Sequence, residues 1–235
     1  MSSHARVSSH VRVSSHVRVS SHVRVSPHAR GVVSPHARGV LIDVGGVLVR
    51  EYLPAAAAAW GRRLGLPAAA FMAALYEGDE SGVLIGRVGA DAWWETVRER
   101  LRTGPDVIAE LRRDLAARET WDEALVACLR GLRGRGVPTA VVSNTWPGLR
   151  TRMADGGLLD IADHIVLSCE VGCAKPDRRI YEIALRPLGI EPAAALFVDD
   201  TPGNVEAAQA LGMAGHVHTG TAETLARIEE FTARR

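Results

Sequence analysis

Two stretches, VLIDVGGVL at residues 40–48 and ALFVDD at residues 195–200, each place carboxylates directly after a short apolar run. Both runs are apolar throughout, which is typical of strands covered on both faces of a parallel sheet. Ligands of such sheets bind beyond the carboxyl ends of the strands. We therefore expect Asp43, Asp199 and Asp200 to meet at one site, where they would supply a nucleophile and metal ligands.

After Trp121, strands and helices alternate in units of the length expected for right-handed crossovers. The pattern predicts helices at 122–133, 147–154, 178–188 and 203–211, strands at 138–142, 164–167 and 195–198, and a last loop and strand at 212–217. With the first strand at residue 40, these units predict an α/β fold with a doubly wound parallel sheet. This core is expected to comprise residues 40–50 and 119–235.

Residues 51–118 show helical spacing and no convincing strand. Helices are predicted at 55–64, 67–76, 90–101 and 105–117, and proline lies in the first turn of the earlier ones, where its missing N–H costs least. This block is predicted to be a helical insertion in the core. Within it, the Trp93–Trp94 pair is expected to pack in the interior, with a substrate-facing aromatic wall as the alternative. Gly86–Arg87 is a further candidate to face a substrate.

Residues 1–39 are of low complexity. They repeat SSHVRV with one alanine variant up to residue 25 and continue as SPHARG, with no large apolar residue to offset the ordering of the backbone. We predict a disordered arm. The alternatives are a His/Arg-rich tether for metal, nucleic acid or anionic surfaces, or a translated nucleotide repeat upstream of the true start.

The 235 residues are 47% hydrophobic and 23% charged, enough for one sizeable core with a smaller appended unit. The net charge is +1, and subtracting the six arginines of residues 1–40, which contain no acidic residue, leaves −5 for the remainder. The remainder is therefore mildly acidic, and its charge does not indicate a basic face for nucleic acid. Because no apolar run approaches the ~20 residues of a membrane span and no secretory signal is recognisable, a cytoplasmic location without membrane association is expected.

The three cysteines, at positions 128, 169 and 173, are odd in number and fit a reducing compartment better than a disulfide framework. Cys169 and Cys173 would be a metal-ligand pair only with a second Cys/His pair nearby, which the sequence lacks. We interpret them as ordinary thiols.

Four polar segments fall at or just after predicted strand ends: 43–47, Ser143–Asn144, Lys175–Pro176, and Asp199–Asp200 with Asn204. Each is weak evidence alone, and Asp200 and Asn204 have helix capping before residues 205–211 as an alternative role. Together, a carboxylate nucleophile, a hydroxyl, an ammonium and an acidic pair describe a magnesium-dependent phosphoryl-transfer site.

From about residue 40 onward the sequence resembles the haloacid dehalogenase-like (HAD) hydrolase superfamily, in the branch whose helical cap is inserted between the first and second motifs. The resemblance is carried by LIDVGGVL at 41–48, VSN at 142–144, KPD at 175–177 with Ile180–Tyr181, and VDDTPGNV at 198–205 followed by Gly212–Met213. It implies a Rossmann-like core and makes residues 51–118 the cap.

The resemblance also implies a nucleophile and a metal site. Asp43 would attack phosphorus and form an aspartyl phosphate, which water later hydrolyses. Mg²⁺ would be held by the carboxylates of Asp43 and Asp199 and by the backbone carbonyl of Gly45, with Asp200 acting directly or through a water.

The remaining implied roles concern the substrate, a small phosphorylated metabolite. Ser143 and the backbone N–H of Asn144 would hold phosphoryl oxygens. Lys175 would offset the repulsion between the anionic nucleophile and the anionic substrate. The identity of the metabolite and the oligomeric state do not follow from the sequence.

The sequence departs from the phosphatase pattern at Gly45. Most phosphatases of the superfamily have a second Asp there, which protonates the leaving group, and general acid catalysis typically contributes ~10²–10⁴-fold. We therefore expect a bias toward activated leaving groups, such as those of acyl phosphates or sugar-1-phosphates, unless Glu51 or a cap residue supplies the proton.

The sequence is also compatible with two alternative functions. A 2-haloacid dehalogenase would use the same Asp43 to attack carbon and also lacks the second Asp. Its metal-free members replace the acidic pair, however, which is intact here as Asp199–Asp200. The other alternative is a weakly active or inactive protein of the same fold that serves in binding, which the absence of an acid at Gly45 motivates.

Overall fold

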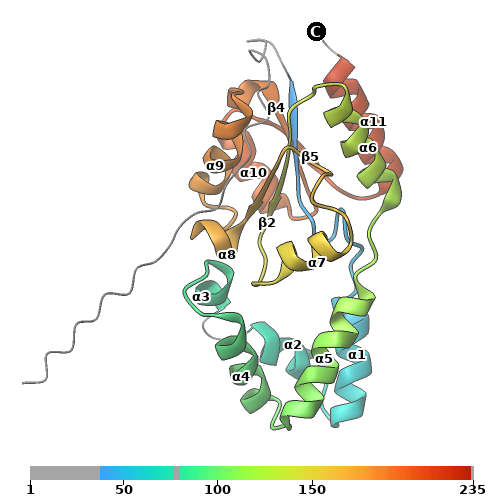
Figure 1. The fold of residues 1–235 in the computed structure, drawn as a ribbon, viewed down its shortest axis with the longest axis vertical. Coiled ribbons are helices and arrows are strands. Elements are labelled where there is room, and N and C mark those ends of the chain that lie inside the picture. The colour runs from blue at the N-terminus through green and yellow to red at the C-terminus, as the bar shows by residue number, and fades with distance from the viewer. Residues whose placement is uncertain (1–37, 77–79, 234–235) are drawn as a thin grey trace, which may run out of the picture. The chain divides into compact units, whose positions relative to one another are not determined.

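Five parallel strands form one sheet, in the order β3-β2-β1-β4-β5. The computed structural model describes residues 38–76 and 80–233 (Figure 1). Its elements are β1 (Gly39–Ile42), α1 (Leu53–Leu64), α2 (Ala68–Tyr76), α3 (Glu80–Leu84), α4 (Ala90–Arg100), α5 (Pro105–Arg118), α6 (Glu123–Gly134), β2 (Thr139–Ser143), α7 (Leu149–Asp155), β3 (His164–Leu167), α8 (Ser168–Val171), α9 (Arg178–Leu188), the 3-10 helix η1 (Pro192–Ala194), β4 (Ala195–Asp199), α10 (Pro202–Ala210), β5 (Ala214–Val217) and α11 (Thr221–Ala233). The predicted α/β fold with a doubly wound parallel sheet is confirmed.

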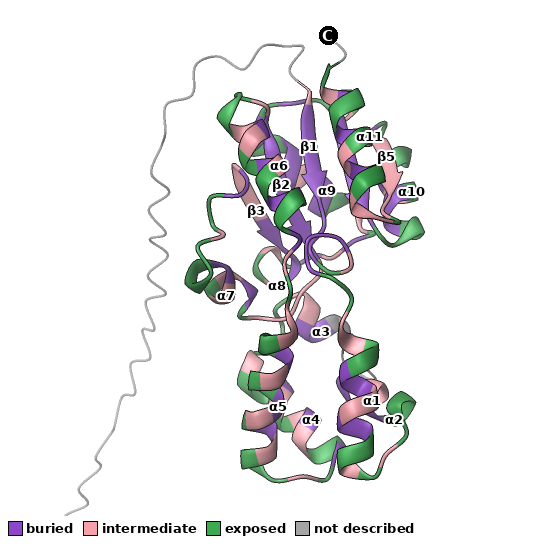
Figure 2. Ribbon diagram, turned by 90° about the vertical axis from the view of Figure 1, so that its right-hand side faces the viewer, coloured by how far each residue is buried: buried purple, intermediate pink, exposed green. Residues whose placement is uncertain are grey.

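Helices cover both faces of the sheet, and the alternation of side chains along each strand explains how (Figure 1). Val40 and Ile42 of β1 join the apolar cluster that includes residues of α6, α7 and α11. Leu41, between them, points to the opposite face and packs in the cluster of α9 and α10. All four residues of β1 are buried, as Figure 2 shows, which explains why this strand is apolar throughout.

The strand β1 lies at the centre of the sheet and pairs with β2 on one side and β4 on the other. Its Ile42 is in register with Val141 of β2 and with Val198 of β4. Because all three strands run parallel, their carboxyl ends reach the same edge of the sheet. The chain runs from β1 through β2 to β3 and then crosses back to β4 on the other side of β1. Ligands of open α/β folds bind where the strand order reverses in this way.

The helices α1 to α5 are inserted between β1 and β2 and have an apolar cluster of their own. Its fully buried members include Phe71, Val97 and Leu111. Trp93 is also buried there, as expected for a residue of the interior. The four helices predicted from the sequence are present, and the short α3 lies between the second and the third of them.

Three parts of the fold differ from the sequence interpretation or lie outside the described residues. Helix α11 was not predicted, since our interpretation ended at residue 217; it buries Thr224, Ile228 and Phe231, which recur at helical spacing. The four-residue α8 is too short to leave a periodic signal. The predicted arm lies outside the described residues up to residue 37. In the described part of the chain, no helix is both long and apolar enough to cross a membrane.

The side chain of Asp122 joins two helices of the core. Its Oδ1 accepts the N–H groups of Ala124 and Leu125, both at 3.1 Å, and so caps the N-terminus of α6. Its Oδ2 accepts the hydroxyl of Thr221 at 2.6 Å and thereby holds the start of α11.

We expect Asp122→Ala to lower the free energy of unfolding by about 2 kcal/mol, because the cap of α6 and the contact with Thr221 are both lost. Asp122→Asn keeps an acceptor oxygen at the cap and should lose much less. Urea denaturation of the three proteins measures the difference. Equal losses in both variants would contradict this role of the carboxylate.

Candidate functional site

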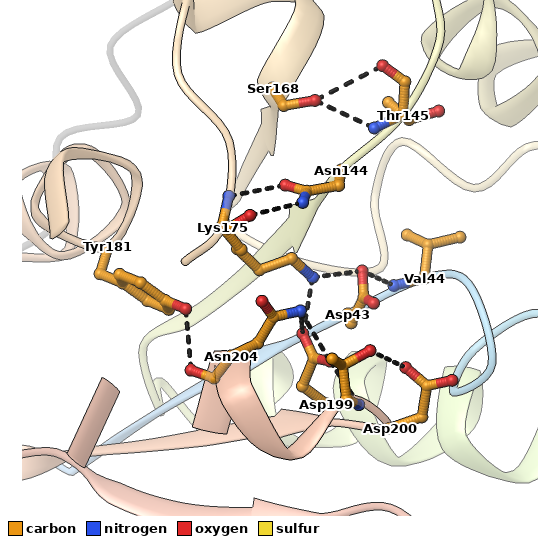
Figure 3. A network of polar contacts seen from close by, with 11 residues as sticks. Asp43, Val44, Asn144, Thr145, Ser168, Lys175, Tyr181, Asp199, Asp200 and Asn204 are labelled. Carbon is orange, nitrogen blue, oxygen red and sulfur yellow. Dashed lines mark hydrogen bonds and ion pairs between the residues drawn. The ribbon is translucent and has the colours of Figure 1, made fainter. Parts of the chain in front are cut away.

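The ammonium group of Lys175 lies between two carboxylates. Its Nζ is 2.7 Å from Oδ1 of Asp43 and 2.7 Å from Oδ2 of Asp199, and the lysine side chain is 0% exposed (Figure 3). Asp43 follows β1 directly, and Asp199 is the last residue of β4. The two strands are neighbours in the sheet, which explains why residues so distant in the sequence share one cation.

Backbone and side-chain donors fix each carboxylate. The N–H of Val44 donates to Oδ1 of Asp43 at 2.7 Å. Asp199 accepts the N–H of Thr201 at 2.8 Å and the side-chain amide of Asn204 at 3.1 and 3.2 Å. Asn204 therefore does not cap helix α10, the alternative considered from the sequence, since it lies within the helix and its amide holds a carboxylate.

A second set of contacts positions Lys175 itself. The side chain of Asn144 donates from Nδ2 to the carbonyl of Lys175 and accepts the N–H of Lys175 at its Oδ1, both at 2.8 Å (Figure 3). One residue further on, the N–H of Thr145 donates to Oγ of Ser168 at 3.0 Å. The loop after β2 is thus tied to the segment that carries the lysine.

A further contact joins helices α9 and α10. The hydroxyl of Tyr181 donates to the carbonyl of Asn204 at 2.8 Å.

The cluster carries more negative than positive charge. Asp43, Asp199 and Asp200 each offer an oxygen within 4.8 Å of the others, and Lys175 is the cation in contact with two of them. Burial, opposed by Lys175 and reinforced by the charge of Asp199, raises the pKa of Asp43 to about 6. Burial and then Asp199 likewise raise the pKa of Asp200. Such a set of oxygen donors with excess negative charge fits a hard divalent cation.

Gly46 allows the acidic pair to approach the loop after β1. Its φ is 74°, in the left-handed region, and a Cβ at this position would collide with the carboxylate of Asp200. A Cβ on the neighbouring Gly45 would meet no heavy atom within 4 Å. The two glycines therefore have different roles: position 46 requires glycine, whereas position 45 has room for a side chain.

We expect Gly46→Ala to lower the free energy of unfolding by about 1–2 kcal/mol, from the left-handed backbone alone, and to displace Asp200. Gly45→Ala is the matched control and should leave stability close to that of the parent protein. Urea unfolding of both variants measures this. If the two variants lost the same stability, neither the left-handed backbone nor the close approach of Asp200 would be the reason for glycine at position 46.

A cavity of about 380 Å³ opens above the cluster. The predicted site residues in its wall are Asp43, Gly45, Ser143, Asn144, Lys175 and Asp200. Asp199, the remaining one, is 0% exposed and lies behind Lys175. The wall also includes Asn204 and Trp146.

Other candidates from the sequence do not line this cavity. Gly86 packs against the backbone carbonyl of Cys169, and Arg87 is likewise absent from the cavity wall. Trp93 and Trp94 also lie outside the wall. The cysteines are free thiols, and the metal-ligand group found among the described residues contains the three aspartates and no sulfur.

Comparison with known proteins agrees with this arrangement. A family model described as haloacid dehalogenase-like hydrolase matches residues 37–212. The chain belongs to this HAD-like hydrolase family. It is 27% identical over 215 residues to bifunctional epoxide hydrolase 2 of Sus scrofa, covering 82% of this chain and 38% of that protein. It is 35% identical over 85 residues to (S)-2-haloacid dehalogenase of Pseudomonas sp. strain YL, covering 36% of this chain and 37% of that protein.

The fold of this HAD-like chain is also similar to solved structures. One is a HAD family enzyme of Bacteroides thetaiotaomicron in complex with magnesium and inorganic phosphate, with a TM-score of 0.63 and 20% identity over 79% of this chain and 96% of that chain. At this identity the likeness establishes the fold alone. The chain spans well under two thirds of the length of both curated relatives named above.

Proposed function

We propose that this protein is a Mg²⁺-dependent phosphohydrolase that acts through an aspartyl-phosphate intermediate on a small phosphorylated metabolite. The observation that carries the proposal is the cluster of three carboxylates around the single ammonium of Lys175. Without a further cation, the excess negative charge would repel a phosphate from the nucleophile. The magnesium and phosphate bound to the fold neighbour from Bacteroides thetaiotaomicron support the same proposal.

In this proposal Asp43 is the nucleophile. It lines the cavity with its side chain fixed by Val44 and Lys175, so that little reorganisation precedes attack on phosphorus. Lys175 offsets the charge of the attacking carboxylate, and Ser143 with the backbone N–H of Asn144 holds phosphoryl oxygens. Attack of water on the aspartyl phosphate releases inorganic phosphate and restores Asp43.

Mg²⁺ would be held by the carboxylates of Asp43, Asp199 and Asp200 and the backbone carbonyl of Gly45. When bound, it would neutralise the excess charge of the site and of the phosphoryl group. We further propose that the inserted helices, residues 51–118, serve as the cap of the site. Tyr52, Tyr76 and Leu84 contribute to the cavity wall from this part of the chain.

The dehalogenase alternative rests on Gly45, which leaves no acid two residues after the nucleophile. Against it stands the intact acidic pair, since a carboxylate substrate would be repelled by Asp199 and Asp200 without a cation. The alternative of a binding protein is opposed by the retention of Asp43, Lys175 and Asp199 in mutual contact.

The first test uses the purified full chain and acetyl phosphate. We expect phosphate release in Mg²⁺ that is lost in EDTA, and no turnover by Asp43→Asn, because an amide is not a nucleophile at phosphorus. Chloride release from 2-chloropropionate is measured in parallel. Metal-independent chloride release would identify a dehalogenase, and an Asp43→Asn protein that retained full hydrolysis would exclude the proposed nucleophile.

A second test concerns the missing general acid. Because position 45 has room for a side chain and lines the cavity, Gly45→Asp should raise kcat on an alkyl phosphate by about tenfold or more. The rate on acetyl phosphate, whose leaving group needs no proton, should change much less. Gly45→Asn is the matched control, with similar size and no acid. Equal effects of Asp and Asn would refute the role of a proton donor at this position.

A further inference from the structure

Apolar and aromatic side chains form part of the wall of the cavity above the carboxylates. This part of its wall consists of Tyr52, Leu53, Tyr76, Leu84, Trp146 and Leu149. Aromatic and aliphatic surfaces of this kind favour a flat, apolar ligand group.

The charged residues that line the cavity outside the predicted site residues are two arginines and two glutamates, so their formal charges cancel. Nε of Arg152 donates to Glu119 at 2.9 Å, and its Nη2 forms an ion pair with the same carboxylate at 2.9 Å. The carboxylate of Glu51 accepts the N–H of Leu53 at 2.9 Å. Outside the predicted site residues, the wall therefore carries no net positive charge for a second anionic group of a substrate.

Trp146 is a pre-formed part of this wall. Its ring centroid lies 4.3 Å from that of Trp93 and 5.5 Å from that of Tyr76. Its backbone follows the loop that Asn144 and Thr145 anchor to Lys175 and Ser168. The indole is thereby held at a fixed place relative to the proposed nucleophile. Ligand binding should therefore cost little conformational entropy of this side chain.

Gly45 constrains the leaving group of the substrate. Position 45 has no acid, and the two glutamates of the wall are engaged elsewhere, Glu51 by the N–H of Leu53 and Glu119 by Arg152. The leaving oxygen then departs as an anion, which favours a weakly basic leaving group. A phenol, with a pKa of about 10 in the case of tyrosine, is far better suited to this than an alkyl alcohol. The apolar and aromatic side chains of the wall favour an aromatic ring over a sugar, and the lack of net positive charge there disfavours a carboxylated metabolite.

We propose that the substrate is a phosphate monoester of an uncharged phenol or similar aromatic hydroxyl compound, whose ring packs against Trp146. The inference rests on the proposed phosphohydrolase function. A carboxylate oxygen of Asp43 forms the bond to phosphorus while the bond from phosphorus to the aryl oxygen breaks. The phenolate leaves with the electron pair and takes a proton from water, and a further water releases inorganic phosphate.

The test compares the binding of two non-hydrolysable probes, 1-naphthylmethylphosphonate and methylphosphonate, by titration calorimetry in Mg²⁺. The naphthyl compound should bind about tenfold more tightly or better. Trp146→Ala should abolish most of this preference and Trp146→Phe should retain it. Trp94→Ala is the matched control, because Trp94 belongs to the same aromatic group but does not line the cavity.

Equal affinity for the two probes, or equal loss of the preference in Trp146→Ala and Trp94→Ala, would overturn the inference. The ratio of kcat/KM for 1-naphthyl phosphate to that for acetyl phosphate gives a second readout and should fall at least fivefold in Trp146→Ala. Hydrolysis of acetyl phosphate without any aryl preference would refute the aryl substrate and leave the phosphohydrolase function standing. Absence of hydrolysis with both substrates would refute both.

Discussion

The contact of Lys175 with Asp43 and Asp199 is the interaction on which the rest of the site depends. Burying three charges is costly unless they are paired and hydrogen-bonded, and here each carboxylate also accepts a backbone N–H, from Val44 or Thr201. The pairing leaves the cluster negatively charged, because Asp200 adds a third carboxylate. The site is thus satisfied as a hydrogen-bonded network and still has an excess charge that a divalent cation would balance.

The sheet brings these groups together. The carboxyl ends of β1, β2 and β4 supply Asp43, Ser143 and Asp199, and their parallel register places the three ends at one edge. The loop after β2 also positions site residues. Its Asn144 is hydrogen-bonded to the backbone of Lys175, and its Trp146 lines the cavity. One short loop therefore links the position of the ammonium to the wall that would receive the leaving group.

The sequence was sufficient to predict the sheet and the aspartates, because buried strands followed by carboxylates form a local pattern. The amide clamp of Asn144 was not predictable, since a Ser-Asn pair after a strand gives no sign of which backbone its side chain will contact. The same holds for Ser168 and Tyr181, whose partners lie far away in the sequence. Trp146 was missed as a wall residue because its partners, Trp93 and Tyr76, belong to the inserted helices.

We propose that the acidic cluster around Lys175 binds a divalent cation, and calorimetric titration of the purified protein with MgCl₂ measures this binding. We expect a single saturable site whose affinity falls by at least tenfold in Asp200→Asn, the variant that removes one carboxylate charge without disturbing the contacts of Lys175. If the parent protein did not bind Mg²⁺, or if Asp200→Asn bound it with unchanged affinity, the cluster would not be the cation site.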